Sequence, residues 1–195
     1  MSQPKYPNNP ELSAQMSQAS SAEKQSQQEQ RPRAEQTSYS EQTSCAEQPS
    51  QAERDRKFML MAINEARKAL KLEEVPIGAV VVCADKIIGR GHNLVETLCD
   101  ATAHAEMQSI TAAATTLGGK YLKGCTLYVT VEPCVMCAGA LAWSQIDRVV
   151  YGAADPKRGY SRLQGQIFHP KTEVVGGVMA DECEELMKDF FRKLR

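Results

Sequence analysis

The chain has 195 residues, of which 42% are hydrophobic and 24% charged, and its formal net charge is −1. This length suits one globular domain with some additional chain, and the near-neutral charge excludes a protein whose net field alone attracts nucleic acid. The seven cysteines follow no disulfide-framework spacing, and neither a signal peptide nor a membrane-spanning run is evident, so we expect a cytoplasmic protein with no membrane contact.

The first 54 residues differ in composition from the rest of the chain. They are rich in Gln, Ser, Glu and Pro and hold few large apolar side chains. Such a segment cannot bury enough apolar surface to offset the entropy lost on ordering. We therefore predict a disordered N-terminal extension at 1–54 and one folded domain at 55–195. The extension is either an adaptor or localisation arm or simply a solvated segment.

Hydrophobic periodicity predicts the elements of the domain. Apolar residues at helical spacing from 58 to 70 predict a first helix, which ends before Val75-Pro76. Short strands at 77–83 and 87–91 flank a turn and indicate a hairpin. The remaining predicted elements are a helix from about 104 to 116, a strand at 126–131, a helix at 135–143, strands at 148–152 and 173–176, and a helix at 181–194.

The closing helix is predicted to bury one apolar face, made of Leu186, Met187, Phe190, Phe191 and Leu194. The order of the elements predicts an α/β fold. Specifically, we expect a three-layer α/β/α sandwich in which a mixed sheet of about five strands carries helices on both faces.

Two short motifs carry the chemistry. His104-Ala-Glu106 is followed by Pro133-Cys134-Val-Met-Cys137. One imidazole and two thiolates make three ligands, the number typical of a catalytic rather than a structural Zn²⁺. Cys134 and Cys137 share one helix face, and a helix N-terminus favours their thiolate forms. His104 and Glu106 can reach one ion only from the first turn of a helix, so we expect two helix N-termini to converge on the metal.

Glu106 is the predicted catalytic residue. Two thiolates neutralise the charge of Zn²⁺, so the ion acidifies a water less than a three-histidine site does, and a nearby base is needed. Glu106 can take the proton of the attacking water and return it to a ring nitrogen and to leaving ammonia. The expected reaction is hydrolytic deamination of an amidine-like ring carbon. The backbone N–H of Ala105 is placed to bind a ring oxygen or hydroxyl of the substrate.

Two other interpretations of the motifs remain open. A structural zinc would need a fourth ligand, for which His92, Cys99 and Cys125 are candidates. A redox pair at Cys134 and Cys137 would leave the histidine and the glutamate without a role.

Beyond the two motifs, the chain resembles the bacterial tRNA-specific adenosine deaminases from about residue 55 to its C-terminus. The resemblance is carried by Val75–Ala79, Gly91-His-Asn93, Asp100–Glu106, Leu127–Ala140, Ala180-Asp-Glu-Cys183 and Asp189-Phe-Phe-Arg192. The zinc motif alone resembles the signature of all zinc-dependent nucleobase deaminases. The run around the cysteines and the Phe-Phe-Arg ending narrow the resemblance to the tRNA branch. Departures from the family pattern lie at His92, Ala101 and 159–169.

The resemblance implies a cytidine-deaminase-like fold and conversion of adenosine to inosine in the tRNA anticodon loop, at the wobble position. It also implies a homodimer with one Zn²⁺ per subunit and no organic cofactor. The family's zinc ligands match His104, Cys134 and Cys137, and its proton shuttle matches Glu106. A family residue that hydrogen-bonds the target base matches Asn93, and one that contacts the RNA ribose-phosphate matches Asp155.

Several basic residues are candidates for phosphate contacts, although they are equally well explained as solvated loop charges. They are Lys157, Arg158, Arg162 and Lys171. Two other functions remain as alternatives. One is a deaminase of a free base or nucleoside, such as guanine or cytosine, and the other is a catalytically silent RNA-binding relative, which would have no use for Glu106.

Overall fold

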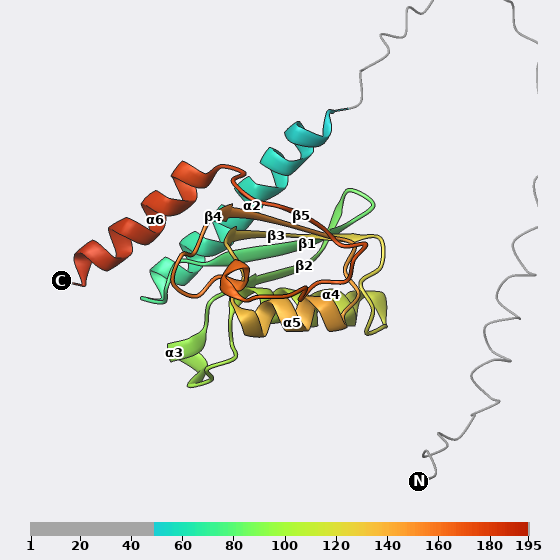
Figure 1. Cartoon of the computed structure of the whole chain (residues 1–195). Coiled ribbons are helices and arrows are strands. Elements are labelled where there is room, and N and C mark those ends of the chain that lie inside the picture. The colour runs from blue at the N-terminus through green and yellow to red at the C-terminus, as the bar shows by residue number, and fades with distance from the viewer. Residues whose placement is uncertain (1–48, 195) are drawn as a thin grey trace, which may run out of the picture. The chain divides into compact units, whose positions relative to one another are not determined.

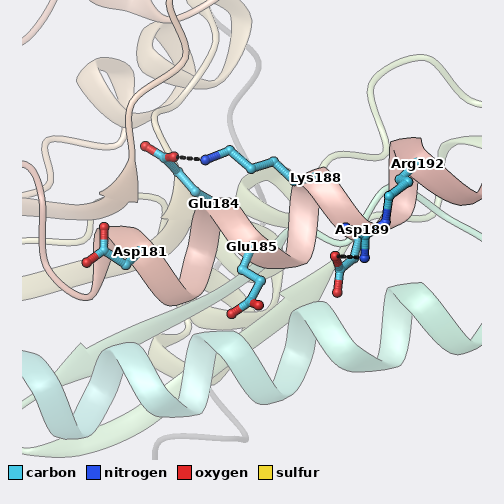
Figure 2. A pocket seen from close by; sticks show the side chains of 6 residues that line it. All are labelled: Asp181, Glu184, Glu185, Lys188, Asp189 and Arg192. Carbon is cyan, nitrogen blue, oxygen red and sulfur yellow. Dashed lines mark hydrogen bonds and ion pairs between the residues drawn. The ribbon is translucent and has the colours of Figure 1, made fainter.

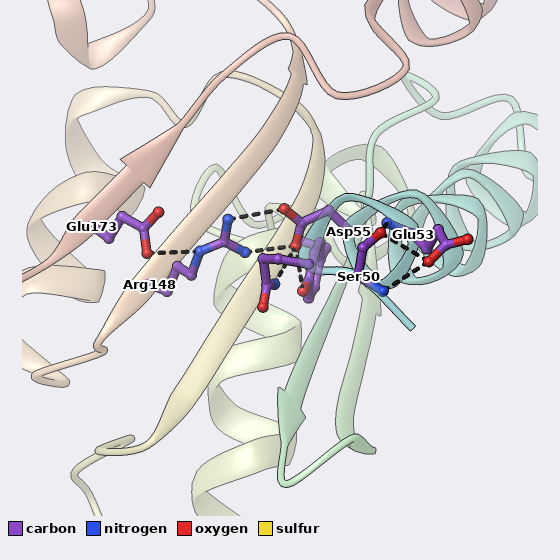
Figure 3. Close-up of polar contacts among 7 residues, drawn as sticks. Ser50, Glu53, Asp55, Arg148 and Glu173 are labelled. Atoms are coloured by element: carbon purple, nitrogen blue, oxygen red, sulfur yellow. Dashed lines mark hydrogen bonds and ion pairs between the residues drawn. The ribbon is translucent and has the colours of Figure 1, made fainter. Parts of the chain in front are cut away.

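A computed structural model describes residues 49–194 of the chain, so most of the extension predicted at 1–54 lies outside the described residues. Its last residues are described and are helical. The first helix, α2 (Gln51–Lys71), begins behind Ser50, whose hydroxyl accepts a hydrogen bond from the Glu53 N–H while the Glu53 carboxylate accepts one from the Ser50 N–H (Figure 3). This capping box starts the folded region at Gln51 rather than at residue 55.

The other elements agree closely with the predicted ones. They are β1 (Gly78–Cys83), β2 (Lys86–His92), α3 (Val95–Leu98), α4 (Ala105–Leu117), β3 (Cys125–Val131), α5 (Val135–Trp143), β4 (Arg148–Ala153), the 3₁₀ turn η1 (Tyr160–Arg162), β5 (Glu173–Val175) and α6 (Ala180–Lys193). The two short elements α3 and η1 were not predicted. Among the described residues, no helix is both long and apolar enough to span a membrane.

The five strands form one mixed sheet with helices on both faces, as Figure 1 shows. The strand order is β2-β1-β3-β4-β5; β1 is antiparallel to β2 and β3, whereas β3, β4 and β5 run parallel. Alternate residues of β1 enter different cores, since Val81 packs with α4 and α5, and Val80 packs with α2. The predicted three-layer α/β/α sandwich is confirmed.

A glycine lets helix α4 lie directly on the edge strand β2. A Cβ atom built on Gly91 would lie 2.2 Å from the Ala105 carbonyl oxygen at the first residue of α4. Any side chain at this position would therefore push the start of α4 away from the sheet. This close contact fixes where the N-terminus of α4 lies.

The predicted buried face of α6 is only partly correct. Phe190 is buried and Leu186 is partly buried, but Phe191 is 47% exposed and Leu194 is 68% exposed. Cys183, absent from the prediction, is buried against the sheet. The reason is geometric, because Leu194 follows the last helical residue and α6 extends past the sheet in Figure 1.

A buried ion pair joins α2 to the parallel half of the sheet. The carboxylate of Asp55, 5% exposed, accepts hydrogen bonds from Nη1 and Nη2 of Arg148 at 2.6 and 2.9 Å. It also accepts one from the Tyr128 hydroxyl at 2.9 Å, and Arg148 Nε donates to Glu173 at 2.9 Å (Figure 3). Burial raises the pKa of Asp55, but hydrogen bonds, first of all from Arg148, outweigh it and hold the pKa below its ordinary value.

We predict that Asp55→Asn lowers the free energy of unfolding by about 3 kcal/mol at pH 7, because Arg148, which is largely buried, would keep only the exposed Glu173 as a charged partner. Since the folded pKa of Asp55 lies below the unfolded value of about 3.9, this contribution is present above that pH and is lost as the pH falls. The free energies of unfolding of the wild type and Asp55→Asn, measured by urea unfolding, should therefore approach each other as the pH falls below about 4.

The matched control is Glu173→Gln, which alters the exposed partner of the same arginine. We expect it to cost less than about 1 kcal/mol. Equal losses in the two variants, or a gap for Asp55→Asn that persists in acid, would contradict the role given to Asp55.

Candidate active site

Two helix N-termini converge on one point at the edge of the sheet. His104 is the N-cap residue of α4 and Cys134 is the N-cap residue of α5, while Cys137 lies in the first turn of α5. The Nδ1 atom of His104 lies 3.6 Å from the Sγ atom of each cysteine. These three atoms all lie within 4.8 Å of one another, so the structure brings the three predicted ligands together.

The spacing of these atoms fits a tetrahedral zinc ion. With Zn–N at about 2.0–2.1 Å and Zn–S at about 2.3 Å, tetrahedral angles separate the nitrogen from each sulfur by about 3.6 Å. The cluster shows this separation twice. Three protein ligands leave one tetrahedral position for water or substrate.

The charges of the two cysteines also suit a cation. A hydrogen bond with Cys137 lowers the pKa of Cys134 to about 4, and a further one with His104 acts in the same direction. The same hydrogen bond, together with burial, raises the pKa of Cys137. A thiolate at Cys134 attracts a cation, and a metal ion bound here would displace the proton of the Cys137 thiol.

Glu106 lies in the first turn of α4 next to this cluster. Its side chain is buried, and its Oε2 atom has no hydrogen-bond partner among residues 49–194. Burial raises the pKa of Glu106 to about 7. A carboxyl group that can gain or lose a proton near neutral pH is suited to general acid–base catalysis. The unpartnered oxygen is also available to a water or substrate held at the open metal position.

The three residues predicted to bind substrate lie in different surroundings. Ala105 is fully buried at the first position of α4, and its N–H is among those that have no acceptor within a helix. Asn93 follows β2, is buried, and donates from Nδ2 to Glu74 at 2.9 Å. Asp155 lies in the loop after β4, where its Oδ1 atom accepts hydrogen bonds from the backbone N–H groups of Lys157 and Arg158. Ala105 directly follows the ligand His104 in the chain, and the substrate contacts of all three residues stay predictions.

Two buried glutamates were missed from the sequence. Glu74 accepts hydrogen bonds from the Asn93 side chain and from the Thr97 N–H, and Glu132 accepts from the N–H groups of Asp155 and Ser161. Burial raises the pKa of Glu74, but its hydrogen bonds outweigh burial and lower it below the usual value. The sequence did hold a signal that Glu132 has a structural or functional role, because this charged residue lies between the apolar strand that ends at Val131 and Pro133 of the metal-binding motif.

No fourth protein ligand joins the cluster within the described part of the chain, which contradicts a structural zinc site. His92 faces Glu65, with 3.5 Å between Nδ1 and Oε2. Cys99 is exposed at the end of α3, and Cys125 lies opposite Cys83 at the far end of β3. Each of the three candidates therefore lies elsewhere.

A hollow of about 340 Å³ along α6 lies outside this site and shows no chemistry of its own (Figure 2). Its lining is charged, and both of its cations pair within the helix, Lys188 with Glu184 and Arg192 with Asp189. It holds none of the residues of the ligand cluster.

The basic residues predicted to meet phosphate are all exposed; they are Lys157, Arg158, Arg162 and Lys171. The guanidinium of Arg162 donates to the carbonyl oxygens of Pro156 and Lys157, at 3.2 and 2.9 Å. This arginine therefore braces its own loop. Lys157 and Arg158 use their backbone N–H groups within the loop, which leaves their side chains available.

Comparison with known proteins places the chain among deaminases. Residues 52–153 match the family described as the cytidine and deoxycytidylate deaminase zinc-binding region. A tRNA-specific adenosine deaminase of Bacillus subtilis is 50% identical over 146 residues, which cover 72% of this chain and 91% of that protein.

Solved structures agree with this placement. One from a study of A-to-I editing by tRNA:A34 deaminases at the wobble position of transfer RNA has a TM-score of 0.63 and 41% identity, and the match covers 67% of this chain and 98% of that chain. A guanine deaminase from Nitrosomonas europaea has the same fold, with a TM-score of 0.63 at 22% identity over 69% of this chain and 83% of that one.

We predict that Cys134→Ala abolishes stoichiometric zinc binding, because two ligands hold the ion far more weakly than three. Metal analysis of the purified protein should give roughly one zinc ion per chain for the wild type and well under half of that for the variant. Cys99→Ala is the matched control and should retain its zinc. Full zinc occupancy in Cys134→Ala would remove this cysteine from the ligand set.

Proposed function

The chain belongs to the tRNA-specific adenosine deaminases, within the cytidine and deoxycytidylate deaminase family, and on this basis we propose that it converts adenosine to inosine at the wobble position of tRNA. The observation that carries the proposal is the convergence of three zinc-type ligands with a buried, unpartnered carboxylate oxygen. A catalytically silent RNA-binding relative would gain nothing from a buried Glu106 carboxylate with an unpartnered oxygen.

The overall reaction joins adenosine and water and yields inosine and ammonia. His104, Cys134 and Cys137 would hold the zinc ion, which would supply a water of lowered pKa when bound. Glu106 accepts the proton of that water as it attacks C6 of adenine, and delivers it to a ring nitrogen. In a second transfer, Glu106 moves the remaining proton of the added hydroxyl to the amino group; the bond between C6 and this nitrogen breaks, the carbonyl of inosine forms, and ammonia leaves. Its pKa of about 7 allows both transfers near neutral pH.

The residues around the centre are proposed to hold the RNA. One N–H of the Asn93 amide is bound to Glu74, so its oxygen and its second N–H are left to bind the target base. The Ala105 N–H is proposed to hold the ring or its new oxygen, and Asp155 to contact the ribose-phosphate. An anticodon loop base is already unpaired, so turning it into the site costs less than opening a duplex.

We propose that the protein is a homodimer that buries the outer face of α5. All nine residues of this helix are apolar or small, yet Val135 is 46% exposed and Trp143 is 86% exposed. The inner face of the same helix carries Cys137. Exposed apolar faces of this kind mark interfaces, and a two-fold dimer would cover the same face on both copies.

We also propose that the protein acts in the cytoplasm, where tRNA is decoded, and that its catalytic domain begins with α2. The cysteines of the described residues are free thiols, as a reducing compartment requires.

The proposed function is tested with zinc-loaded protein and an anticodon stem-loop that has adenosine at the wobble position. We expect inosine in this RNA and none in a stem-loop with adenosine only elsewhere. Free adenosine, guanine and cytosine are offered in parallel reactions. Turnover of a free base with an unchanged stem-loop would show that the chain is a small-molecule deaminase instead.

Glu106→Gln in the same assay separates chemistry from folding. It keeps the shape of the side chain but cannot carry a proton, so we expect turnover to fall by at least about a thousandfold while zinc content is unchanged. Activity near that of the wild type would exclude Glu106 as the proton shuttle.

For the dimer, we predict that Trp143→Glu shifts the protein to monomer, because it places a charge in the proposed apolar interface. Light scattering after size-exclusion chromatography measures the mass. Leu60→Glu is the matched control, since Leu60 is 41% exposed on α2, on the other side of the sheet. A wild-type monomer, or a dimer in both variants, would contradict the α5 interface.

A further inference from the structure

The loop that follows β4 is docked against the turn that carries a zinc ligand. Gly159 forms an isolated antiparallel bridge with Cys134, and the Tyr160 N–H donates to the Pro133 carbonyl at 3.0 Å. The loop is thus attached to the backbone of the metal-binding turn itself. Its position relative to the zinc ligands is set by these contacts.

One buried carboxylate holds both ends of this loop. Glu132 is 5% exposed; its Oε2 atom accepts from the Asp155 N–H and its Oε1 atom from the Ser161 N–H, each at 3.0 Å. Gly159 lies between these two residues, and a Cβ atom built on it would lie 2.4–2.5 Å from the Glu132 carboxyl group. The loop therefore closes tightly around the carboxylate, and only glycine fits at its centre.

The part of the loop between the two attachments presents cations beside the site. Lys157 and Arg158 follow Asp155, whose side chain caps their N–H groups, and both side chains are exposed. Arg158 directly precedes Gly159, which pairs with the backbone of the proposed zinc ligand Cys134, so the loop carries these cations next to the proposed metal centre.

We propose that Glu132 is a positioning residue for RNA binding, which fixes the loop 155–161 so that Lys157 and Arg158 meet the phosphates beside the target nucleotide. This rests on the proposed function. Because Glu132 lies two residues before Cys134, the same short segment places both the metal ligand and the phosphate-binding cations. Loss of the carboxylate would leave the zinc ligands in place and would release the cations from their correct position.

Glu132→Gln tests the proposal because its amide has one acceptor oxygen, so one loop N–H would face an NH₂ group instead. We expect KM for the anticodon stem-loop to rise roughly tenfold, while kcat changes less than about twofold and zinc content stays the same. Hydrogen exchange of the segment 154–163, measured by mass spectrometry, should become faster in the variant. Gly159→Ala should give the same pattern by a second route, through displacement of the loop.

The matched control is Glu184→Gln, which removes the same charge from the exposed surface of α6 and should change neither KM nor exchange in the loop. Wild-type KM and wild-type exchange in Glu132→Gln would overturn the proposal, and so would a fall in kcat at unchanged KM. If the wild type makes no inosine, the proposed function fails. The exchange measurement then still decides whether Glu132 holds the loop.

Discussion

The structure depends on bringing two helix N-termini to one point. A helix start exposes N–H groups without acceptors and carries positive partial charge, which stabilises thiolates and carboxylates. His104 and Cys134 both occupy the N-cap position, so each ligand leaves the backbone where a helix begins. The contact between Gly91 and the start of α4 fixes the position of the α4 N-terminus. The N-terminus of α5 is positioned by β3, which pairs with β4 in the sheet and directly precedes α5 in the chain. The ligand geometry is therefore a consequence of how helices pack on this sheet, more than of the motif residues alone.

The buried carboxylates show how one side chain can serve two purposes. Glu74 and Glu132 lie in the interior with both oxygens accepting hydrogen bonds, and each holds a segment near the site. Glu106 is equally buried but has an oxygen without a partner. Hydrogen bonds outweigh burial and lower the pKa of Glu74, whereas burial dominates at Glu106 and raises its pKa to about 7. The supply of hydrogen-bond donors thus favours an ionised Glu74 and leaves Glu106 able to transfer a proton.

The sequence predicted the sheet, the helices on its two faces and the ligand cluster because each rests on a local pattern. Apolar alternation identifies the strands, and the spacing of the two motifs implies helices that begin at the metal. Contacts between distant segments could not be predicted in this way: Asp55 with Arg148, or Glu132 with Ser161, are joined only once the sheet has formed. The start of α2 was also missed, although here a local signal existed, because Ser50 and Glu53 form a capping box that can be recognised in the sequence. Phe191 and Leu194 were misplaced because helical periodicity cannot tell where the sheet beneath a helix ends.

The departures of this chain from the family pattern fall where they leave the metal centre undisturbed. His92 is paired with Glu65 on α2, so its side chain serves the helix packed on the other face of the sheet. Ala101 is exposed, as are residues 161–166 of the divergent loop. That loop is anchored on either side, where the rings of Tyr160 and Phe168 pack edge to face at 4.9 Å between centroids. If the loop contacts RNA as proposed, variation between these fixed anchors would change the RNA surface that is contacted without moving Cys134 or Glu106. For this reason, differences in substrate range among such enzymes are expected to map to the loop after β4, while the hydrolytic chemistry is retained.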